Sequence, residues 1–113
     1  MNRCRFQNRR SLIVLTAMVA ALAGATATAN PAGKAKAAAV CNVCHGANGM
    51  SQMPAAPHLA GQPEMYVREQ LRAYRSGKRQ NEIMSIIAKP LTDDEIADLS
   101  AWYASIEITA TVK

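Results

Sequence analysis

The stretch CNVCH at positions 41–45 constrains this chain more than any other, because it sets two thiols and an imidazole within five residues. Positions i and i+3 lie on one face of a helical turn, so both sulfurs point to the same side. This pattern is the attachment signature of a c-type haem. We therefore predict one haem c, bound covalently through Cys41 and Cys44, with its iron ligated on the proximal side by His45.

Two other uses of a C-x-x-C pair fit less well. A zinc site built from Cys41, Cys44, His45 and His58 would require adjacent residues to meet one tetrahedral ion, which departs from ordinary zinc spacing. A disulfide oxidoreductase would place the pair near a βαβ pattern, and the sequence has no stretch with convincing strand alternation. The haem interpretation is therefore favoured.

The first 29 residues have the layout of a secretory signal peptide. Residues 1–10 contain four arginines and no acid, residues 12–23 are apolar, and residues 27–29 (ATA) supply small side chains for cleavage. We predict a signal peptide over 1–29, with cleavage after Ala27 as the near alternative, and a mature domain over 30–113 that is exported to the periplasm. The apolar stretch is shorter than the ~20 residues of a spanning helix, so we expect no stable membrane insertion after cleavage.

The net charge of +5 comes mostly from this leader. Without its four arginines, nine Lys and Arg residues remain against eight Asp and Glu residues. The basic composition therefore gives no support for nucleic-acid binding. Cys4 also lies in the leader, so no second pair of cysteines is left to form a disulfide. A domain this small needs some additional stabilisation, and a haem would supply a large apolar core element.

We expect an all-α domain, a small fold of about four helices packed around the haem. The Ala-rich stretch predicts a first helix over 33–44 that Gly46 ends, and residues 30–33 would form a tail before it. Residues 46–61 contain several turn signals and predict an ordered loop.

Two longer helices and one short one follow. Pro63 favours a helix start, and the apolar positions i, i+4 and i+7 of that helix predict an inward face made of Val67, Leu71 and Tyr74. A short apolar segment over 82–88 allows one or two helical turns before Pro90. The last helix opens with a capping box, Thr92 and Glu95. Its inward positions are Ile96, Leu99, Tyr103 and Ile106.

The distal ligand of the iron is best supplied by Met84. It lies 39 residues beyond His45, in an apolar segment flanked by turns, after a helix that can carry the chain across the haem. Met50 and Met53 are too close to His45 to reach the opposite face easily, and Met65 is near the start of the second helix. His58 is the runner-up. A thioether ligand raises the reduction potential, and the closed coordination favours an electron carrier over an enzyme.

The second ring nitrogen of His45 also needs a partner, because a metal-bound imidazole normally donates its free N–H to an acceptor. The carbonyl of a loop proline is well suited to this. Spacing alone leaves Pro57 and Pro54 both open, and we prefer Pro57.

Three segments make the chain recognisable: residues 41–51 (CNVCHGANGMS), 57–79 (PHLAGQPEMYVREQLRAYRSGKR) and 81–104 (NEIMSIIAKPLTDDEIADLSAWYA). Together they resemble the class I c-type cytochromes, in particular the cytochrome c4 and cytochrome c-553 group. The likeness extends over roughly 38–105. It implies the cytochrome c fold around one haem.

The resemblance also assigns roles to single residues. It implies thioether bonds at Cys41 and Cys44, His45 and Met84 as axial ligands, and Pro57 as the carbonyl partner of His45. It further implies that the aromatic pair Trp102 and Tyr103 packs on the first helix and the haem pocket. Pro90 stands where members of this group often have glycine.

The function expected from these observations is single-electron transfer in the periplasm between redox proteins, by a monomeric carrier. The alternative is a haem c subunit of a multi-subunit dehydrogenase or oxidase complex, which would co-purify with its partner. A peroxide- or gas-binding protein would require that Met84 does not bind the iron.

Overall fold

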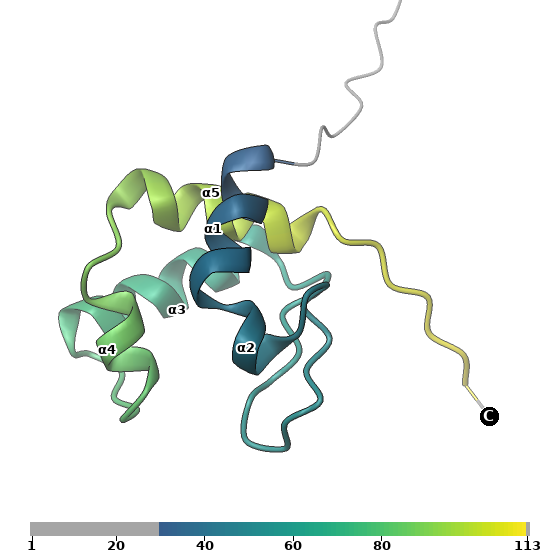
Figure 1. The fold of residues 1–113 in the computed structure, drawn as a ribbon, viewed down its shortest axis with the longest axis horizontal. Coiled ribbons are helices and arrows are strands. Elements are labelled where there is room, and N and C mark those ends of the chain that lie inside the picture. The colour runs from purple at the N-terminus through teal and green to yellow at the C-terminus, as the bar shows by residue number, and fades with distance from the viewer. Residues whose placement is uncertain (1–29, 113) are drawn as a thin grey trace, which may run out of the picture.

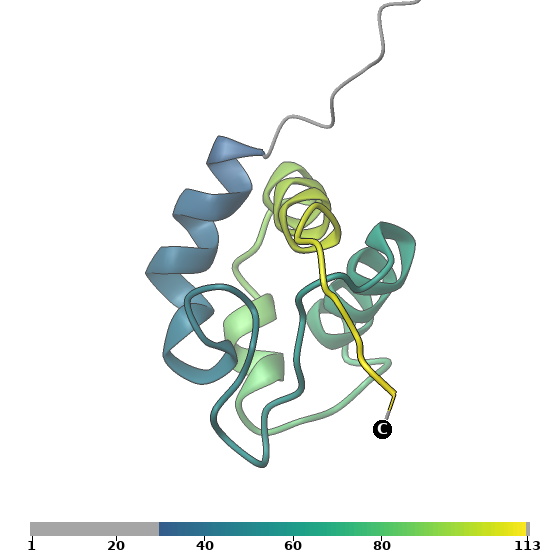
Figure 2. The same ribbon diagram turned by 90° about the vertical axis from the view of Figure 1, so that its right-hand side faces the viewer.

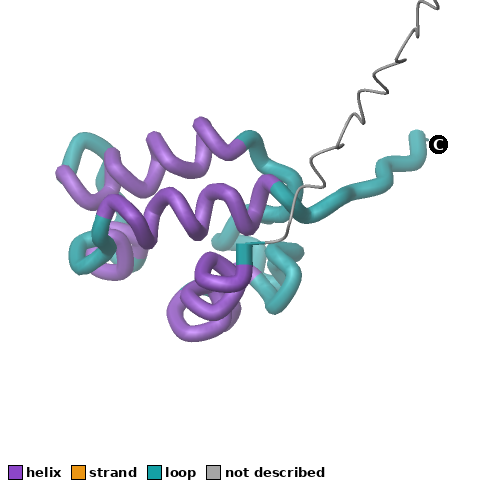
Figure 3. The backbone as a smooth tube through the Cα atoms, turned by 90° about the horizontal axis from the view of Figure 1, so that it is seen from above, coloured by secondary structure: helices purple, strands orange, loops and turns teal. Residues whose placement is uncertain are grey.

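The computed structural model describes residues 30–112, so the predicted signal peptide over 1–29 lies outside the described residues. Within 30–112 the chain forms helices and no strand, which confirms the all-α prediction (Figures 1 and 3). The helices are α1 (Pro31–Val40), α2 (Asn42–His45), α3 (Glu64–Ser76), α4 (Met84–Ala88) and α5 (Asp93–Ala104). No helix in this part of the chain is long and apolar enough to cross a membrane.

The predicted first helix is in fact two helices, and it begins earlier than expected. Asn30 caps α1 by accepting a hydrogen bond from the Gly33 N–H at 3.0 Å, and Pro31 is the first helical residue. Residues 30–33 are therefore not a tail. At Cys41 the backbone (φ −109°) departs from helix geometry, and α2 follows with a new direction. Residues 30–112 therefore form five helices where about four were expected, because the predicted first helix is divided into α1 and α2.

α1 crosses α5 at very close range. A Cβ atom added to Gly33 would lie 2.1 Å from the Asp98 carbonyl oxygen and 2.7 Å from Cβ of Trp102. Ala37, one turn further on, is 1% exposed. Small residues on this face of α1 therefore let the two backbones approach, and that approach sets where α2 begins.

α3 and α5 lie side by side and run in opposite directions, while α1 stands across them (Figures 1, 2 and 3). α2, α4 and the loop over 46–62 lie on one side of this layer (Figure 1). Gly77, at φ 80°, ends α3 in the left-handed conformation that glycine adopts without strain. The least regular segments of the fold are therefore attached to three helices, α1, α3 and α5, which we call the frame.

The hydrophobic core packs the three helices of the frame against the end of α4 and the segment that follows it. The predicted capping box is present, with Thr92 and Glu95 each bonding the backbone N–H of the other at 3.1 and 2.9 Å. Leu71, Tyr74 and Ile106 are only half-buried and pack against the core edge. The buried cluster comprises Ala37, Val67, Ala88, Leu91, Ile96, Leu99 and Tyr103.

Candidate haem-binding site

The junction of α1 and α2 brings the two thiols and the imidazole together. Cys41 ends α1 with a 2.9 Å hydrogen bond from its N–H to the Ala37 carbonyl. The Cys41 carbonyl then accepts hydrogen bonds from the N–H groups of Cys44 and His45, at 3.2 and 3.0 Å. Both thiols are free and half-buried, and His45 is only 6% exposed. One tight turn thus holds all three groups.

The His45 ring is held from the loop. Its Nδ1 lies 2.8 Å from the carbonyl oxygen of Pro57, so this nitrogen donates the hydrogen bond and Nε2 is the ring nitrogen available to a metal. Of the two prolines that spacing left open, it is Pro57 that meets His45. A backbone acceptor of this kind sets both the tautomer and the ring orientation.

Ser51 connects the loop to the cysteine turn. Its side chain is buried, and its hydroxyl donates to the Cys44 carbonyl at 2.8 Å and accepts from the Met53 N–H at 2.9 Å. Its backbone N–H donates to Nδ1 of His58 at 2.9 Å. His58, the runner-up for the distal ligand, therefore stabilises the loop that carries Pro57.

The two aromatic residues of α5, Trp102 and Tyr103, make different contacts. Trp102 lies against α1 at Gly33, and the Lys34 ammonium sits 5.6 Å from its ring centre. Tyr103 is 2% exposed and packs in the same cluster as Cys41. Burial raises the pKa of the Cys41 thiol, opposed by the Tyr103 hydroxyl and by Lys36. The Cys41 sulfur thus lies in a largely apolar environment beside Tyr103.

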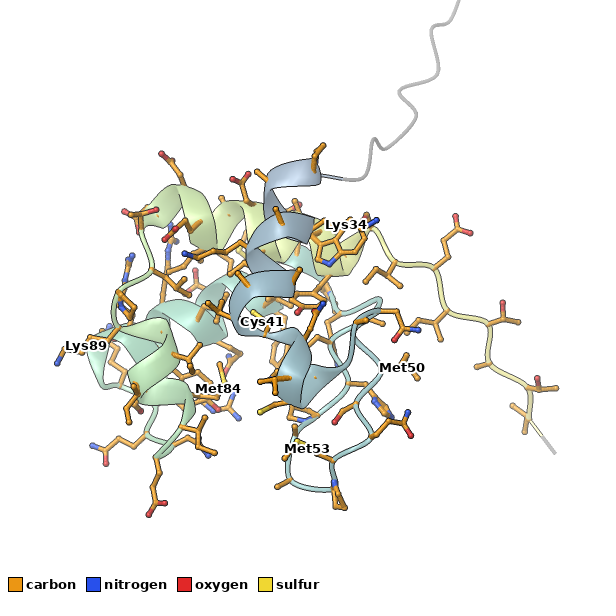
Figure 4. All side chains as sticks on the ribbon, in the orientation of Figure 1. Lys34, Cys41, Met50, Met53, Met84 and Lys89 are labelled. Carbon is orange, nitrogen blue, oxygen red and sulfur yellow. The ribbon has the colours of Figure 1, made fainter. Side chains whose placement is uncertain are left out.

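Met84 is the first residue of α4 and is half-buried. Figure 4 shows Met84 on α4 and Cys41 at the end of α1, with Met50 and Met53 on the loop next to α2. Met53 and Met65 are 45% and 65% exposed. Of the methionines considered as distal ligands, Met84 lies on α4, whereas Met50 and Met53 lie on the loop and Met65 lies on α3.

The donor set suits a covalent haem. Two free thiols lie in the turn that ends at a buried imidazole, and a thioether comes from a separate helix. The buried Tyr103 hydroxyl interacts with the Cys41 thiol and has no other hydrogen-bond partner within residues 30–112. No cluster of three or more His, Cys, Asp or Glu side chains in the same residues could hold a metal ion. The roles of the individual residues toward a haem stay predictions.

Two residues important for this geometry were not predicted. Ser51 gave no signal, because its role depends on a loop that returns to the cysteine turn. Asn81 did give one: an Asn directly before a short apolar run is a helix-start signal. Its side chain accepts hydrogen bonds from the N–H groups of Ile83 and Met84, at 3.0 and 2.9 Å.

Comparison with known proteins places these features in context. The family described as Cytochrome c matches residues 31–107, which include all five helices. Cytochrome c4 of Thiocapsa roseopersicina is 49% identical over 74 residues, covering 66% of this chain and 38% of that protein. The thiosulfate dehydrogenase electron acceptor of Thiomonas intermedia is 43% identical over 95 residues, covering 80% and 43%.

Two further relatives differ in how much of them is matched. Cytochrome c-554(548) of Halomonas halodenitrificans is 39% identical over 70 residues, covering 59% of this chain and 84% of that protein. The solved structure of cytochrome c4 of Acidithiobacillus ferrooxidans has a TM-score of 0.64 at 32% identity, covering 74% and 53%. The chain thus spans less than half the length of the first two relatives and most of the third.

Proposed function

Because this chain belongs to the cytochrome c family, as a class I c-type cytochrome with covalently bound haem c, we propose that it carries single electrons in the periplasm with one iron ligated by His45 and Met84. Cys41 and Cys44 hold the haem through thioether bonds. The family relation itself supports electron transfer between redox partners. The ligand set, the single haem and the compartment are the finer parts of the proposal.

The observation that carries the proposal is the buried His45 ring with Nδ1 2.8 Å from the Pro57 carbonyl, one residue after Cys44. A hydrogen bond at Nδ1 leaves Nε2 unprotonated and ready to act as a ligand. The same bond fixes the ring plane and raises its basicity. Such a ligand is held in one geometry, which suits a site that must change charge without rearranging.

On the other side, Met84 offers a soft, neutral sulfur. When bound, the haem iron would supply reversible one-electron chemistry, and ligation by Met84 and His45 would raise its reduction potential. A bound Met84 sulfur would keep out oxygen and small substrates. The residues therefore favour a carrier over an enzyme.

The partners we propose are redox proteins, approached by a monomeric carrier. One relative is named a thiosulfate dehydrogenase electron acceptor, which favours a dehydrogenase as donor and keeps a second candidate in view: a permanent subunit of such an enzyme. A free carrier sediments as a monomer and is purified alone. A subunit is recovered at constant ratio with a larger protein, even at high salt.

The periplasmic location rests on the basic and apolar pattern of residues 1–29. It predicts that the exported protein begins at Asn30 and contains one haem. Recovery of the haem protein outside the periplasmic fraction would contradict this location. The intact mass of the recovered protein measures the cleavage site and the haem content, and a mass that includes residues 1–29 would contradict cleavage.

The test of the ligand set is the absorption spectrum of the matured protein, oxidised and reduced, in wild type and in Met84→Ala. We expect a covalent haem in both proteins and a weak far-red band of the sulfur–iron bond in the oxidised wild type only. Met65→Ala, which removes an exposed methionine, is the matched control and keeps the band. A band that survives Met84→Ala would show that the distal ligand is another residue.

A further inference from the structure

We infer that Asn81 is a positioning residue for the distal ligand: its side chain holds the backbone of Met84 and thereby resists displacement of the methionine sulfur by another ligand. The inference rests on the proposed function, since it takes Met84 as the ligand. It concerns what keeps that ligand in place, which neither the motif nor the family relation assigns.

Asn81 makes a compact network around the start of α4. Its Oδ1 accepts the N–H groups of Ile83 and Met84, at 3.0 and 2.9 Å, which are the second and third residues after it. Its backbone N–H donates to the Ser85 hydroxyl at 3.1 Å, and the Ser85 N–H donates to the Asn81 carbonyl at 3.0 Å. The side chain thus acts as a helix cap, and one of the two N–H groups it binds belongs to Met84 itself.

The turn that contains Asn81 is fastened to α3. The Arg79 N–H donates to the Ala73 carbonyl at 3.0 Å, and its guanidinium lies 4.6 Å from the centre of the Tyr74 ring. The same guanidinium also donates to Gln70. These contacts hold Arg79 against α3. Because Asn81 is only two residues further along the chain, its position relative to α3 is restrained as well.

Besides its packing on α3, α4 has few buried contacts. It is five residues long, far below the length at which an isolated helix is stable. Ile83 and Ile86 are 59% and 72% exposed, and Ala88 is its one fully buried residue. A segment with so few buried contacts opens locally before the rest of the domain. The cap at Asn81 is therefore a large part of what opposes that opening.

Imidazole is a suitable probe, because it binds ferric haem only when the methionine has left. Its apparent affinity is measured by titrating the oxidised holoprotein and following the far-red band. A cap is typically worth a factor of about five in the equilibrium it stabilises. We therefore expect Asn81→Ala to bind imidazole roughly fivefold more tightly than wild type, and Asn81→Asp, which keeps an oxygen acceptor, to restore most of the difference.

Thr92→Ala is the matched control, because Thr92 caps α5, a helix that carries no ligand, and accepts the Glu95 N–H at 3.1 Å. It is expected to lower thermal stability like Asn81→Ala and to leave imidazole affinity unchanged. An equal effect of both substitutions on imidazole affinity would overturn the inference, as would an unchanged affinity in Asn81→Ala. If Met84→Ala itself keeps the far-red band, the proposed function fails first and this inference with it.

Discussion

The two sides of the site are built in opposite ways. On the proximal side, the cysteine pair and His45 are contiguous, His45 is 6% exposed, and the Pro57 carbonyl holds its ring at 2.8 Å. On the distal side, Met84 is half-buried on a five-residue helix whose neighbours Ile83 and Ile86 point largely to solvent. One proposed ligand is fixed by the cysteine turn and by the carbonyl of a nearby loop, and the other lies on a short helix that follows α3.

This difference indicates which half controls the chemistry. A ligand held by contiguous residues and two thioether bonds stays with the haem whenever the haem is present. A ligand held by a short capped helix leaves whenever that helix opens. We therefore expect perturbations of the proximal side to change whether a stable holoprotein forms, and perturbations of the distal side to change its potential and its reactivity toward added ligands.

The largest effect is expected for His45→Ala. Removing the buried proximal ligand should abolish the low-spin spectrum of the holoprotein, because the distal thioether alone does not hold the iron. The absorption spectra of the oxidised and reduced proteins measure this. His58→Ala removes an imidazole that accepts a hydrogen bond from Ser51 and is not proposed as a ligand, so this control variant should keep a low-spin spectrum. A low-spin spectrum in His45→Ala would mean that the proximal ligand is wrongly assigned.

Gly33→Ala should be next in size. Its new methyl group would lie 2.1 Å from a backbone oxygen of α5, so α1 must shift and carry the cysteine turn with it. The free energy of unfolding should fall by about 2–3 kcal/mol. Gly77→Ala has open space but a φ of 80°, and should cost about 1 kcal/mol at the entry to the distal segment. Denaturant titration of both holoproteins compares them, and the reverse order would contradict the close crossing of α1 and α5.

Ser51→Ala should have a smaller effect on stability, about 1–2 kcal/mol, because it leaves the Cys44 carbonyl and the Met53 N–H without their partner. The loop that carries Pro57 should loosen, which weakens the hydrogen bond to His45 and shifts the reduction potential. Potentiometry of Ser51→Ala and of Ser76→Ala, which removes an exposed hydroxyl at the end of α3, separates the loop from general loss of a hydroxyl. Equal potentials in Ser51→Ala and wild type would contradict the role given to this serine.

The smallest effect is expected at the exit of the distal segment, where Arg75 donates to the Leu91 carbonyl at 2.9 Å and to Asp93 at 2.5 Å. Arg75 lowers the pKa of the Asp93 carboxyl in the folded protein. A lowered pKa stabilises the fold above the unfolded pKa, about 4, and this contribution is lost as the pH falls through the folded value. Asp93→Asn should therefore lower the unfolding temperature at pH 7 and not at pH 2. The same loss at both pH values would exclude the ion pair as its cause.

Much of the fold follows from local signals in the sequence. The capping box at Thr92 and the inward face around Val67 needed no tertiary information, and the all-α prediction is confirmed. The start of α1 was misplaced although Asn30 and Pro31 are ordinary start signals, because they were assigned to a tail after the predicted cleavage. The break at Cys41 had no signal, since an Ala-rich stretch favours continuing the helix.

The residues of the site show the same difference between local sequence signals and tertiary contacts. Cys41, Cys44 and His45 could be proposed from five adjacent residues, because their geometry is local. Ser51 could not, since its partners meet it only after the loop has folded back. Asn81 stands between the two cases: its capping signal is local, whereas its importance depends on the proposed role of Met84.

The most direct test of this account is a guanidinium titration of the oxidised holoprotein, followed at the far-red band for the Met84 bond and by far-UV circular dichroism for the helices. We predict that the band disappears at a lower denaturant concentration than the helical signal. The reason is that the segment that contains α4 and Met84 opens before the frame of α1, α3 and α5 unfolds. Coincident transitions would show that Met84 is held as firmly as the rest of the protein, and would contradict the proposed difference between the two sides.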